Sequence, residues 1–488
     1  MPISFNNIPN TQRVPLVYVE FDNTRAVQGT PAIQHKLLIV GQRLTTGTVA
    51  EGVPTLINSA AEGETFFGRG SMLAAMIEAA KSANRHTEMW AIGLDDATGG
   101  VQATGTITVT GAATASGSIP LYIGGKKISV AVASGDAATA IAAAINAAIN
   151  ADTSLPVTST VLTTVVTMTC RWDGETGNDI DVRDSYYQGE SLPAGVALAY
   201  SGFASGAANP DIATAITAMA GEQYHTMVIP FTDATNLTAL ETELADRWGP
   251  LQQIDGMAFT AYRGTVAATQ TFGNGRNSAH VTCMATGVSP QAPYVWASVN
   301  AAVASASLSI DPARPLQTLA LNNIMPPALT ARHTRDERNT LLFDGIATHS
   351  VDAGGRVLIE RQVTMYQTNA QSVPDTSYLD VNTPYTLSYL RYSLRARIAL
   401  RFPRHKLASD GTRYGVGQTI VTPNVIKGEL IALFGEWEES GLVENFEQFK
   451  DDLVVERDAS DANRLNVQIS PDLVNQFRIF ASQIQFIV

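Results

Sequence analysis

An abrupt change of composition divides this 488-residue chain and limits the folds that it can adopt. Between Ala97 and Cys170, Thr, Val, Gly and Ala dominate, and the charged residues are only Lys126, Lys127, Asp136 and Asp152. Runs of β-branched residues separated by glycine turns are typical of strands. One Ala-rich helix interrupts these runs, with a stripe of three isoleucines, Ile141, Ile145 and Ile149. We therefore predict an inserted β-rich domain at residues 96–205 that carries a single packed helix.

The segments on either side of this insertion share an α/β pattern. The stretch HKLLIVG (35–41) is typical of a buried strand, SMLAAMIEAAKSA (71–83) of a helix, and EMWAIGL (88–94) of another strand. After Pro210 the alternation of helices and strands resumes. Such alternation favours a mostly parallel sheet covered by helices. The simplest interpretation is one discontinuous α/β core formed by residues 23–95 and 206–345.

The last third of the chain has a different character. A hairpin is indicated around Gly354-Gly355. Thr422 and Pro423 suit the N-cap and the first turn of a helix that ends at Gly441. Its apolar face carries Ile426, Leu430, Leu433, Phe434 and Trp437. We expect a C-terminal α+β domain at 346–474, so that the whole chain is an α/β (α+β multidomain) protein.

Both ends of the chain have the pattern of strands without evident partners. In the last segment, 475–488, the apolar residues Ile484, Phe486 and Val488 alternate with glutamines, and no charge or proline interrupts them after Arg478. In the N-terminal segment, 1–22, a similar alternation contains Leu16, Tyr18, Val19 and Phe21. An unpaired strand edge tends to pair with another chain. Each arm therefore either docks into its own sheet or completes the sheet of another chain.

The sequence contains no local motif for catalysis or for metal or cofactor binding. GGKKIS (124–129) lacks the upstream glycine of a phosphate loop, and a hairpin turn is the better interpretation. The seven histidines include no i, i+4 pair and no nearby cysteine, which argues against zinc. DGETGNDID (173–181) is interpreted as a polar turn, with weak metal binding as the alternative. We expect a protein that is not an enzyme and needs no cofactor.

The overall charge and hydrophobicity limit the possible partners. The net charge of −13 argues against general binding to nucleic acid or anionic membranes. No apolar run is long enough to cross a membrane, and the opening MPISFNNIPN does not resemble a signal peptide. Two cysteines more than a hundred residues apart are expected to be buried reduced thiols, Cys170 and Cys283. Synthesis in a cytoplasm is the expectation.

The main concentration of charge is the basic stretch LRYSLRARIALRFPRHKL (390–407). It includes Arg391, Arg395 and Arg401. One interpretation is a solvated helix face whose acidic neighbours come from elsewhere in the fold. A second is a strip that docks on an acidic protein partner. Nucleic-acid binding is the third, although no aromatic stacking residues interleave with the basic ones.

Several long stretches of the sequence point, in order, to one protein family. The first is RVPLVYVEFDNTRAVQGTP near the N-terminus. The others are LFDGIATHSVDAGGRVLIERQVTMYQ (342–367), YLDVNTPYTLSYLR (378–391), RHKLASDGTRYGVGQTIVTP (404–423), GLVENFEQFKDDLVVERDASDANRLNV (441–467) and the terminal VNQFRIFASQIQFIV. These stretches resemble the tail sheath proteins of contractile bacteriophage tails, in particular their Mu-like branch. The resemblance covers most of the chain outside the insertion.

The resemblance implies a structural subunit of the virion, assembled in the host cytoplasm. Subunits of this family stack as six-membered rings around an inner tail tube, and contraction drives the tube through the host envelope. The implied partners are other copies of the chain, the tube protein, the baseplate and the tail terminator, without direct nucleic-acid binding or membrane insertion. The two terminal arms would exchange strands between subunits. The C-terminal region would face the tube, with Arg391, Arg395 and Arg401 as candidate contacts, and the insertion would project outward.

Two other classes of function remain open at the level of sequence. A doubly wound α/β sheet hosts many enzymes, and an active site assembled from distant residues would leave no local motif. A nucleic-acid-binding protein would use the arginine strip at 390–407.

Overall fold

The computed structural model describes residues 13–15, 17–20, 33–415 and 417–487. Three residues predicted to act in the arms, Leu16, Phe21 and Val488, lie outside this set. The chain divides into two compact units. The large unit comprises Gln34–Tyr389, Glu438–Asn445 and the segment from Pro471 to the C-terminus, and the small unit contains Leu390–Trp437, Phe446–Ser470 and the described N-terminal residues.

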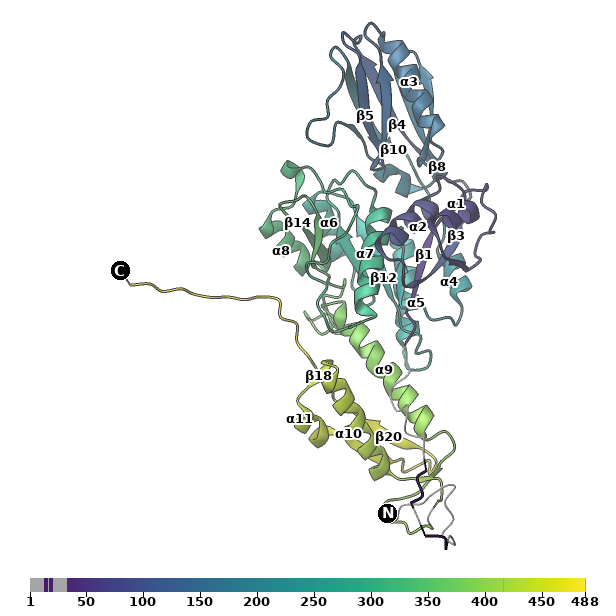
Figure 1. Ribbon diagram of the computed structural model, residues 1–488, viewed down its shortest axis with the longest axis vertical. Helices are drawn as coiled ribbons and strands as arrows, with labels where there is room; N and C mark the ends of the chain where they lie inside the picture. Colours follow the sequence, from purple (N-terminus) through teal and green to yellow (C-terminus); the bar gives the residue numbers. More distant parts are fainter. Residues whose placement is uncertain (1–12, 16, 21–32, 416, 488) are drawn as a thin grey trace. The chain divides into compact units, whose positions relative to one another are not determined.

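An eight-stranded sheet forms the centre of the large unit, in the order β15-β14-β13-β12-β11-β1-β3-β2 (Figure 1). The strands from β14 to β3 are parallel, and the two edge strands, β15 and β2, are antiparallel to their neighbours. The strands are β1 (Lys36–Gln42), β2 (Thr55–Ile57), β3 (Glu88–Leu94), β11 (Thr226–Val228), β12 (Met257–Tyr262), β13 (Val281–Ala285), β14 (Ile346–Val351) and β15 (Val357–Arg361).

Helices cover this sheet because its central strands are apolar on both faces. In β1, four consecutive residues from Leu37 to Val40 are fully buried. Helix α7 packs against α2 and against β11, β12 and β1, and is therefore buried almost all round. The helices of the core are α1 (Ala60–Phe67), α2 (Met72–Ala83), α4 (Ala213–Met219), α5 (Ala234–Trp248), α6 (Val266–Asn274), α7 (Pro293–Leu308) and α8 (Arg335–Phe343), with a short 3₁₀ turn, η2 (Leu329–Ala331).

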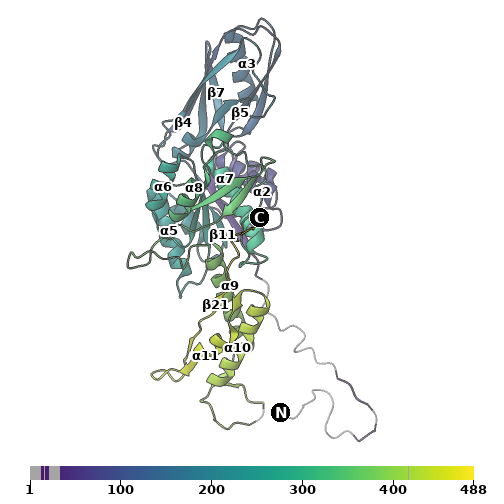
Figure 2. The same cartoon turned by 90° about the vertical axis from the view of Figure 1, so that its left-hand side faces the viewer.

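The β-rich segment lies between two halves of this one sheet. In the sequence, β1 and β3 precede this segment and β11 follows it. In the sheet, β1 pairs with both β3 and β11. It contains two antiparallel sheets, β10-β4-β8-β7 and β6-β5-β9, together with α3 (Figure 2). Its elements are β4 (Gln102–Thr110), β5 (Gly117–Ile123), β6 (Lys126–Val132), α3 (Ala138–Ala151), β7 (Val157–Leu162), β8 (Val165–Asp173), η1 (Glu175–Asp179), β9 (Val182–Asp184) and β10 (Ala197–Ala204).

The packing of this inserted segment follows its sequence pattern. The predicted stripe of Ile141, Ile145 and Ile149 on α3 is buried. Trp172 at the end of β8 is fully buried and meets the Tyr294 ring of α7 edge-on at 5.9 Å. The glycines of GGKKIS form the turn between β5 and β6 in left-handed conformations, as the hairpin interpretation requires.

The start of the C-terminal region differs from the expectation. The sequence suggests a separate domain from residue 346, but residues 346–361 form β14 and β15 of the core sheet. The reason is that β14 pairs in parallel with β13, and the tight turn at Gly355 then returns the chain as an antiparallel edge strand. The sequence indicates this hairpin, but it does not indicate with which strand of the core the hairpin pairs.

The small unit contains helices and short strands. Helix α10 (Pro423–Glu439) buries the predicted apolar face, and the indole of Trp437 donates to Ser393 Oγ of α9 (Asn382–Arg401) at 2.8 Å. Phe434 stacks on Phe449 of α11 (Phe446–Asp452) at 4.0 Å. The strands of this unit are β16 (Lys406–Leu407), β17 (Ile420–Val421), β19 (Val454–Arg457) and β20 (Leu465–Gln468). In the large unit, β18 (Val443–Glu444) pairs with β21 (Asp472–Leu473).

These observations confirm the predicted class, a mixed α/β protein with several domains. A search of the described residues for a helix that could cross a membrane finds none.

Two histidines meet in the interior of the large unit, where the chain enters β1 and β11. The rings of His35 and His225 lie 4.4 Å apart. Burial lowers the pKa of His35 to about 4, and burial together with the nearby His35 and Lys36 lowers the pKa of His225 to about 3. Both rings are therefore neutral in the folded protein at pH 7. The Tyr385 hydroxyl of α9 donates to the His225 carbonyl oxygen at 3.0 Å, so this hydrogen bond links the start of α9 to the histidine pair.

We predict that acid destabilises the fold through this pair. In the unfolded chain each histidine titrates near pH 6.5, so the neutral pair contributes its full stabilisation above that pH and loses it between about pH 6.5 and 3. The free energy of unfolding should fall by up to roughly 1.4 kcal/mol per pH unit for each ring. Urea unfolding from pH 7 to 4.5 measures this slope. His35→Phe should reduce the slope relative to the wild-type protein; an unchanged slope in this variant would contradict the assignment.

Candidate assembly interface

The root of the C-terminal arm is held by specific polar contacts within the large unit. The Val474 amide donates to the Leu442 carbonyl oxygen, directly after β21 has paired with β18. Gln476 Nε2 then donates to the Ala313 carbonyl oxygen at 3.2 Å, and Gln317 Nε2 donates to the Phe477 carbonyl oxygen at 3.3 Å. The arm therefore leaves the core at a defined point.

An ion cluster closes this root. The Arg478 guanidinium lies 3.0 Å from Asp380, and Arg361 makes two bonds of 3.0 Å to the same carboxylate. The Arg478 side chain is only 13% exposed. Burial lowers the pKa of Arg478, and the Asp380 carboxylate opposes that shift. Arg478 is the last charged residue of the chain, so the charge marks the boundary between the anchored and the exposed parts of the arm.

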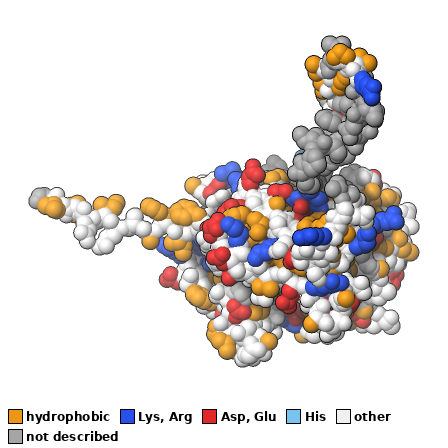
Figure 3. Space-filling view, turned by 90° about the horizontal axis from the view of Figure 1, so that it is seen from below, with side chains coloured by type: hydrophobic (Ala, Val, Ile, Leu, Met, Phe, Trp, Pro, Cys, Tyr) orange, Lys and Arg blue, Asp and Glu red, His pale blue; other side chains and the backbone are white. Residues whose placement is uncertain are grey.

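Every described residue beyond Arg478 is exposed. No residue from Ile479 to Ile487, all of which are described, forms a hydrogen bond or an ion pair or belongs to a strand. Figure 3 shows hydrophobic side chains along this segment and no charged ones. The exposed fractions of the large apolar residues are Ile479 82%, Phe480 78%, Ile484 85%, Phe486 82% and Ile487 100%. Of the two alternatives from the sequence, docking into its own sheet is not what the described arm does.

The described part of the N-terminal arm is similarly exposed. Val17 is 85% exposed and Val19 72%, and neither lies in a strand. The Tyr18 hydroxyl donates to the Val14 carbonyl oxygen at 3.1 Å.

A short hairpin in the small unit offers open strand edges. Strands β19 and β20 pair from Val454↔Gln468 to Arg457↔Leu465, and neither pairs with a third strand among the residues that are described. Two-stranded hairpins are marginally stable alone. Its turn is fixed by Asp458, whose pKa is lowered to about 2 by hydrogen bonds from the Asn466 side chain and from two backbone amides.

The arginine strip is partly neutralised within the small unit. Arg397 is buried and bonds to Glu429 at 3.0 Å and to Glu436 of α10. Arg401 lies 3.4 Å from the same Glu429. Thus one predicted contact residue, Arg401, has an acidic neighbour supplied by another helix, as the first interpretation of this stretch requires. The other two, Arg391 and Arg395, lie on α9.

The structure also places the polar turn at 173–181 and the two cysteines. Groups of three or more His, Cys, Asp or Glu that could hold a metal ion are absent from the described residues. DGETGNDID folds into the end of β8 and the 3₁₀ turn η1, where burial raises the pKa of Asp179 to about 6. Both cysteines are buried and unbridged. The Arg478–Asp380 cluster, in contrast, is a feature that sequence reasoning missed; its signal was a lone charge in an uncharged tail.

Comparison with known proteins gives matches over nearly the whole chain. Sequence models of phage tail sheath domains match residues 98–197 (beta-sandwich domain), 205–365 (central domain) and 373–487 (C-terminal domain). The Mu-like prophage FluMu tail sheath protein of Haemophilus influenzae is 49% identical over 488 residues and matches 100% of both chains.

Two solved structures align with most of the chain at low sequence identity. The sheath tail protein of Listeria innocua is 14% identical, with 92% of this chain and 94% of that chain covered and a TM-score of 0.50. The sheath tail protein of Desulfitobacterium hafniense is 12% identical, with 94% and 100% covered and a TM-score of 0.49.

The ion cluster at the arm root generates a prediction. In Arg478→Gln the arm should loosen, while the core keeps its stability to within about 1 kcal/mol, because Arg361 still satisfies Asp380. Limited proteolysis should then cut closer to Val474, and urea unfolding should change little. The matched control is Arg356→Gln, which removes an exposed ion pair with Asp352 at the turn of the β14–β15 hairpin, outside the cluster. A loss of more than about 3 kcal/mol would instead mean that Arg478 supports the core.

Proposed function

Because this chain belongs to the phage tail sheath protein family, we propose that its copies are linked by exchanged terminal strands into a sheath around an inner tail tube. The protein is a structural component of a phage tail, and sheath proteins assemble with copies of themselves. The observation that carries the proposal is the apolar, uncharged arm after Arg478, which is anchored at its root and exposed beyond it.

The physical driving force for exchange is the unpaired backbone and the apolar surface of the arm. In β-augmentation, an extended segment adds a strand to an open sheet edge. Burial of Ile484 and Phe486 should contribute about 1.5–3 kcal/mol each. Each new ladder hydrogen bond would add roughly 0.5–1.5 kcal/mol. One arm is then worth several kcal/mol, which is enough to keep neighbours linked while they change their relative orientation.

The acceptor that we propose is the β19–β20 hairpin of a neighbouring copy. It has two open edges among the described residues, and a two-stranded sheet gains stability from every strand added to it. At about 3.3 Å per residue, residues 479–487 reach on the order of 30 Å. The N-terminal segment, with Tyr18 and Val19, would serve as a second exchanged strand. Four strands from three chains would then form one sheet.

We propose that contraction of this lattice drives the tube through the host envelope. The free energy would be stored in subunit packing, so no nucleotide would be consumed. A baseplate would give the signal, a tail terminator would close the far end, and assembly would take place in the host cytoplasm. Strand links of several kcal/mol suit this role because they survive a rearrangement that breaks weaker contacts.

We also propose that Arg391, Arg395 and Arg401 contact an acidic surface of the tube. Exposed ion pairs give only about 0–1 kcal/mol each and are screened over ~8 Å at physiological salt. Contacts of this strength could align subunits during assembly and release on contraction. Arg401 would exchange its 3.4 Å contact with Glu429 for one with the tube.

The strand-exchange proposal predicts a difference between the two faces of the arm. Ile484→Asp with Phe486→Asp should leave a folded protein and abolish assembly, because the charges would enter the face that packs on the acceptor. The matched control, Gln483→Asp with Gln485→Asp, adds the same charges to the other face and should assemble. Circular dichroism and sedimentation velocity measure both properties. Tubes of normal length from the first variant would exclude packing of this face.

The tube-contact proposal makes a separate prediction. Reversal of Arg391, Arg395 and Arg401 to glutamate should block polymerisation on purified tubes but spare arm-mediated polymers of the sheath protein. Electron microscopy of the mixture should then show naked tubes beside tube-free polymers. Sheathed tubes of normal length would return these arginines to the role of a solvated helix face.

A further inference from the structure

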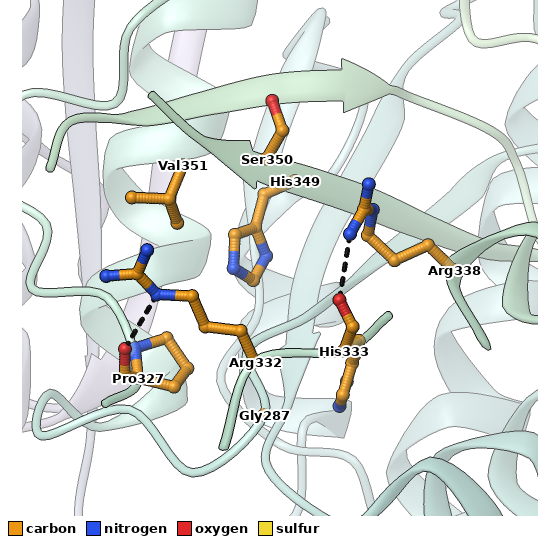
Figure 4. A pocket seen from close by; sticks show the side chains of 8 residues that line it. All are labelled: Gly287, Pro327, Arg332, His333, Arg338, His349, Ser350 and Val351. Carbon is orange, nitrogen blue, oxygen red and sulfur yellow. Dashed lines mark hydrogen bonds between the residues drawn. The ribbon is translucent and has the colours of Figure 1, made fainter. Parts of the chain in front are cut away.

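A small recess on the large unit is lined by basic side chains and is unrelated to either arm (Figure 4). Its volume is about 140 Å³, which is room for a four-oxygen ion and a few waters but not for an extended ligand. The lining comes from β14, from the start of α8 and from the loops at 287 and 327. It contains Gly287, Pro327, Arg332, His333, Arg338, His349, Ser350 and Val351.

His349 lines the recess, and a hydrogen bond fixes which of its two ring nitrogens carries the hydrogen. The residue is 9% exposed, and its ring contacts Trp296 at 4.7 Å. Its Nδ1 lies 3.0 Å from the Ala285 carbonyl oxygen, which can only accept, so Nδ1 carries the hydrogen. In the neutral ring, Nε2 is then a hydrogen-bond acceptor. Burial lowers the pKa of His349 to about 4, which keeps the ring neutral at pH 7.

Arg332 brings a positive charge that its surroundings do not neutralise. Its Nε donates to the Pro327 carbonyl oxygen at 3.1 Å, which orients the guanidinium. The two terminal nitrogens have no hydrogen-bond or ion-pair partner in the described part of the chain. Figure 4 shows the His349 ring directed toward the Arg332 side chain, whereas the Ser350 hydroxyl points to the opposite side of the strand.

The other charged groups around the recess are already engaged. Arg338 makes two bonds to Glu360, at 2.7 and 3.1 Å, and a third to the His333 carbonyl oxygen at 2.8 Å. Glu337 accepts from the Thr334 amide and hydroxyl in the cap of α8. Glu360 and Glu337 therefore bond to other groups, and neither forms an ion pair with Arg332.

From this arrangement we propose that the recess binds hydrogen phosphate, with Arg332 donating to an anionic oxygen and His349 Nε2 accepting from the hydroxyl of the ion. Hydrogen phosphate carries both an anionic oxygen, which suits the Arg332 guanidinium, and a hydroxyl, which suits His349 Nε2. Sulfate and carboxylates are anions at neutral pH but carry no such donor, so the site should discriminate against them. An oxygen of sulfate or of a carboxylate would face His349 Nε2 as a second acceptor and leave this buried nitrogen unpaired. An unpaired buried polar group strongly disfavours binding of such a ligand.

Gly287 keeps this recess open. Its φ of +59° is left-handed, and a Cβ there would lie 3.3 Å from Pro327 and 3.5 Å from His333 Nε2. A side chain at this position would be strained and would enter the space that the ion needs.

Isothermal titration of the full-length protein with inorganic phosphate, and separately with sulfate, at pH 7.5 and matched ionic strength tests the proposal. Phosphate should bind with a Kd at least roughly tenfold lower than that of sulfate, because sulfate leaves His349 Nε2 unpaired. Arg332→Gln should raise the Kd for phosphate by roughly tenfold or more, through loss of a charge-assisted bond. The control Arg356→Gln, on the same β14–β15 hairpin but outside the recess, should leave it unchanged.

Three outcomes would overturn the proposal: no phosphate binding by the wild-type protein, equal affinities for phosphate and sulfate, or an unchanged phosphate Kd in Arg332→Gln. The comparison of the two ions needs only the wild-type chain, so a folding defect in a variant does not affect it. The arms are not altered in any of these measurements, and the result is therefore independent of strand exchange.

Discussion

The backbone of the C-terminal arm, from Ile479 to Ile487, has no hydrogen-bond partner in the described chain. Residues 479–487 expose backbone donors and acceptors along both edges of the extended segment. They also expose large apolar side chains, whose contact with water is unfavourable. In an isolated chain this exposed backbone hydrogen-bonds to water, and the ion cluster of Arg478, Asp380 and Arg361 fixes the arm root at the core surface. The same cluster makes the exposed arm useful, since a strand captured by a neighbour transmits force only if its root is held.

The interior of the large unit supplies the rigidity that such a link needs. Its parallel strands are buried on both faces, and α7 is enclosed by α2 and the sheet. The neutral His35–His225 pair and the hydroxyl of Tyr385 connect the sheet to the start of α9. Within the small unit, Arg397 and Trp437 fasten α9 to α10. Firmly packed bodies joined by exchangeable strands suit a lattice that rearranges without unfolding.

Sequence periodicity predicted the features that a short stretch of the chain reveals by itself. These are the α/β alternation, the Ile141–Ile149 stripe and the apolar face of α10. Periodicity did not place residues 346–361 in the core sheet, because parallel pairing with β13 depends on a distant strand. The ion cluster and the recess at His349 also join residues far apart in the chain, so no spacing could reveal them. The resemblance to one family, not any chemical motif, carried the functional prediction.

Disulfide trapping between two chains tests whether the arm of one copy pairs with the β19–β20 hairpin of another. One chain would carry Gln485→Cys, and the other Val454→Cys or Gln468→Cys, one cysteine on each hairpin strand; the native cysteines are buried. A disulfide requires Cα atoms about 4.4–6.8 Å apart. We predict that oxidised co-polymers contain covalent dimers only when both chains are present. Polymers that form normally but give no dimer with either hairpin position would contradict the account.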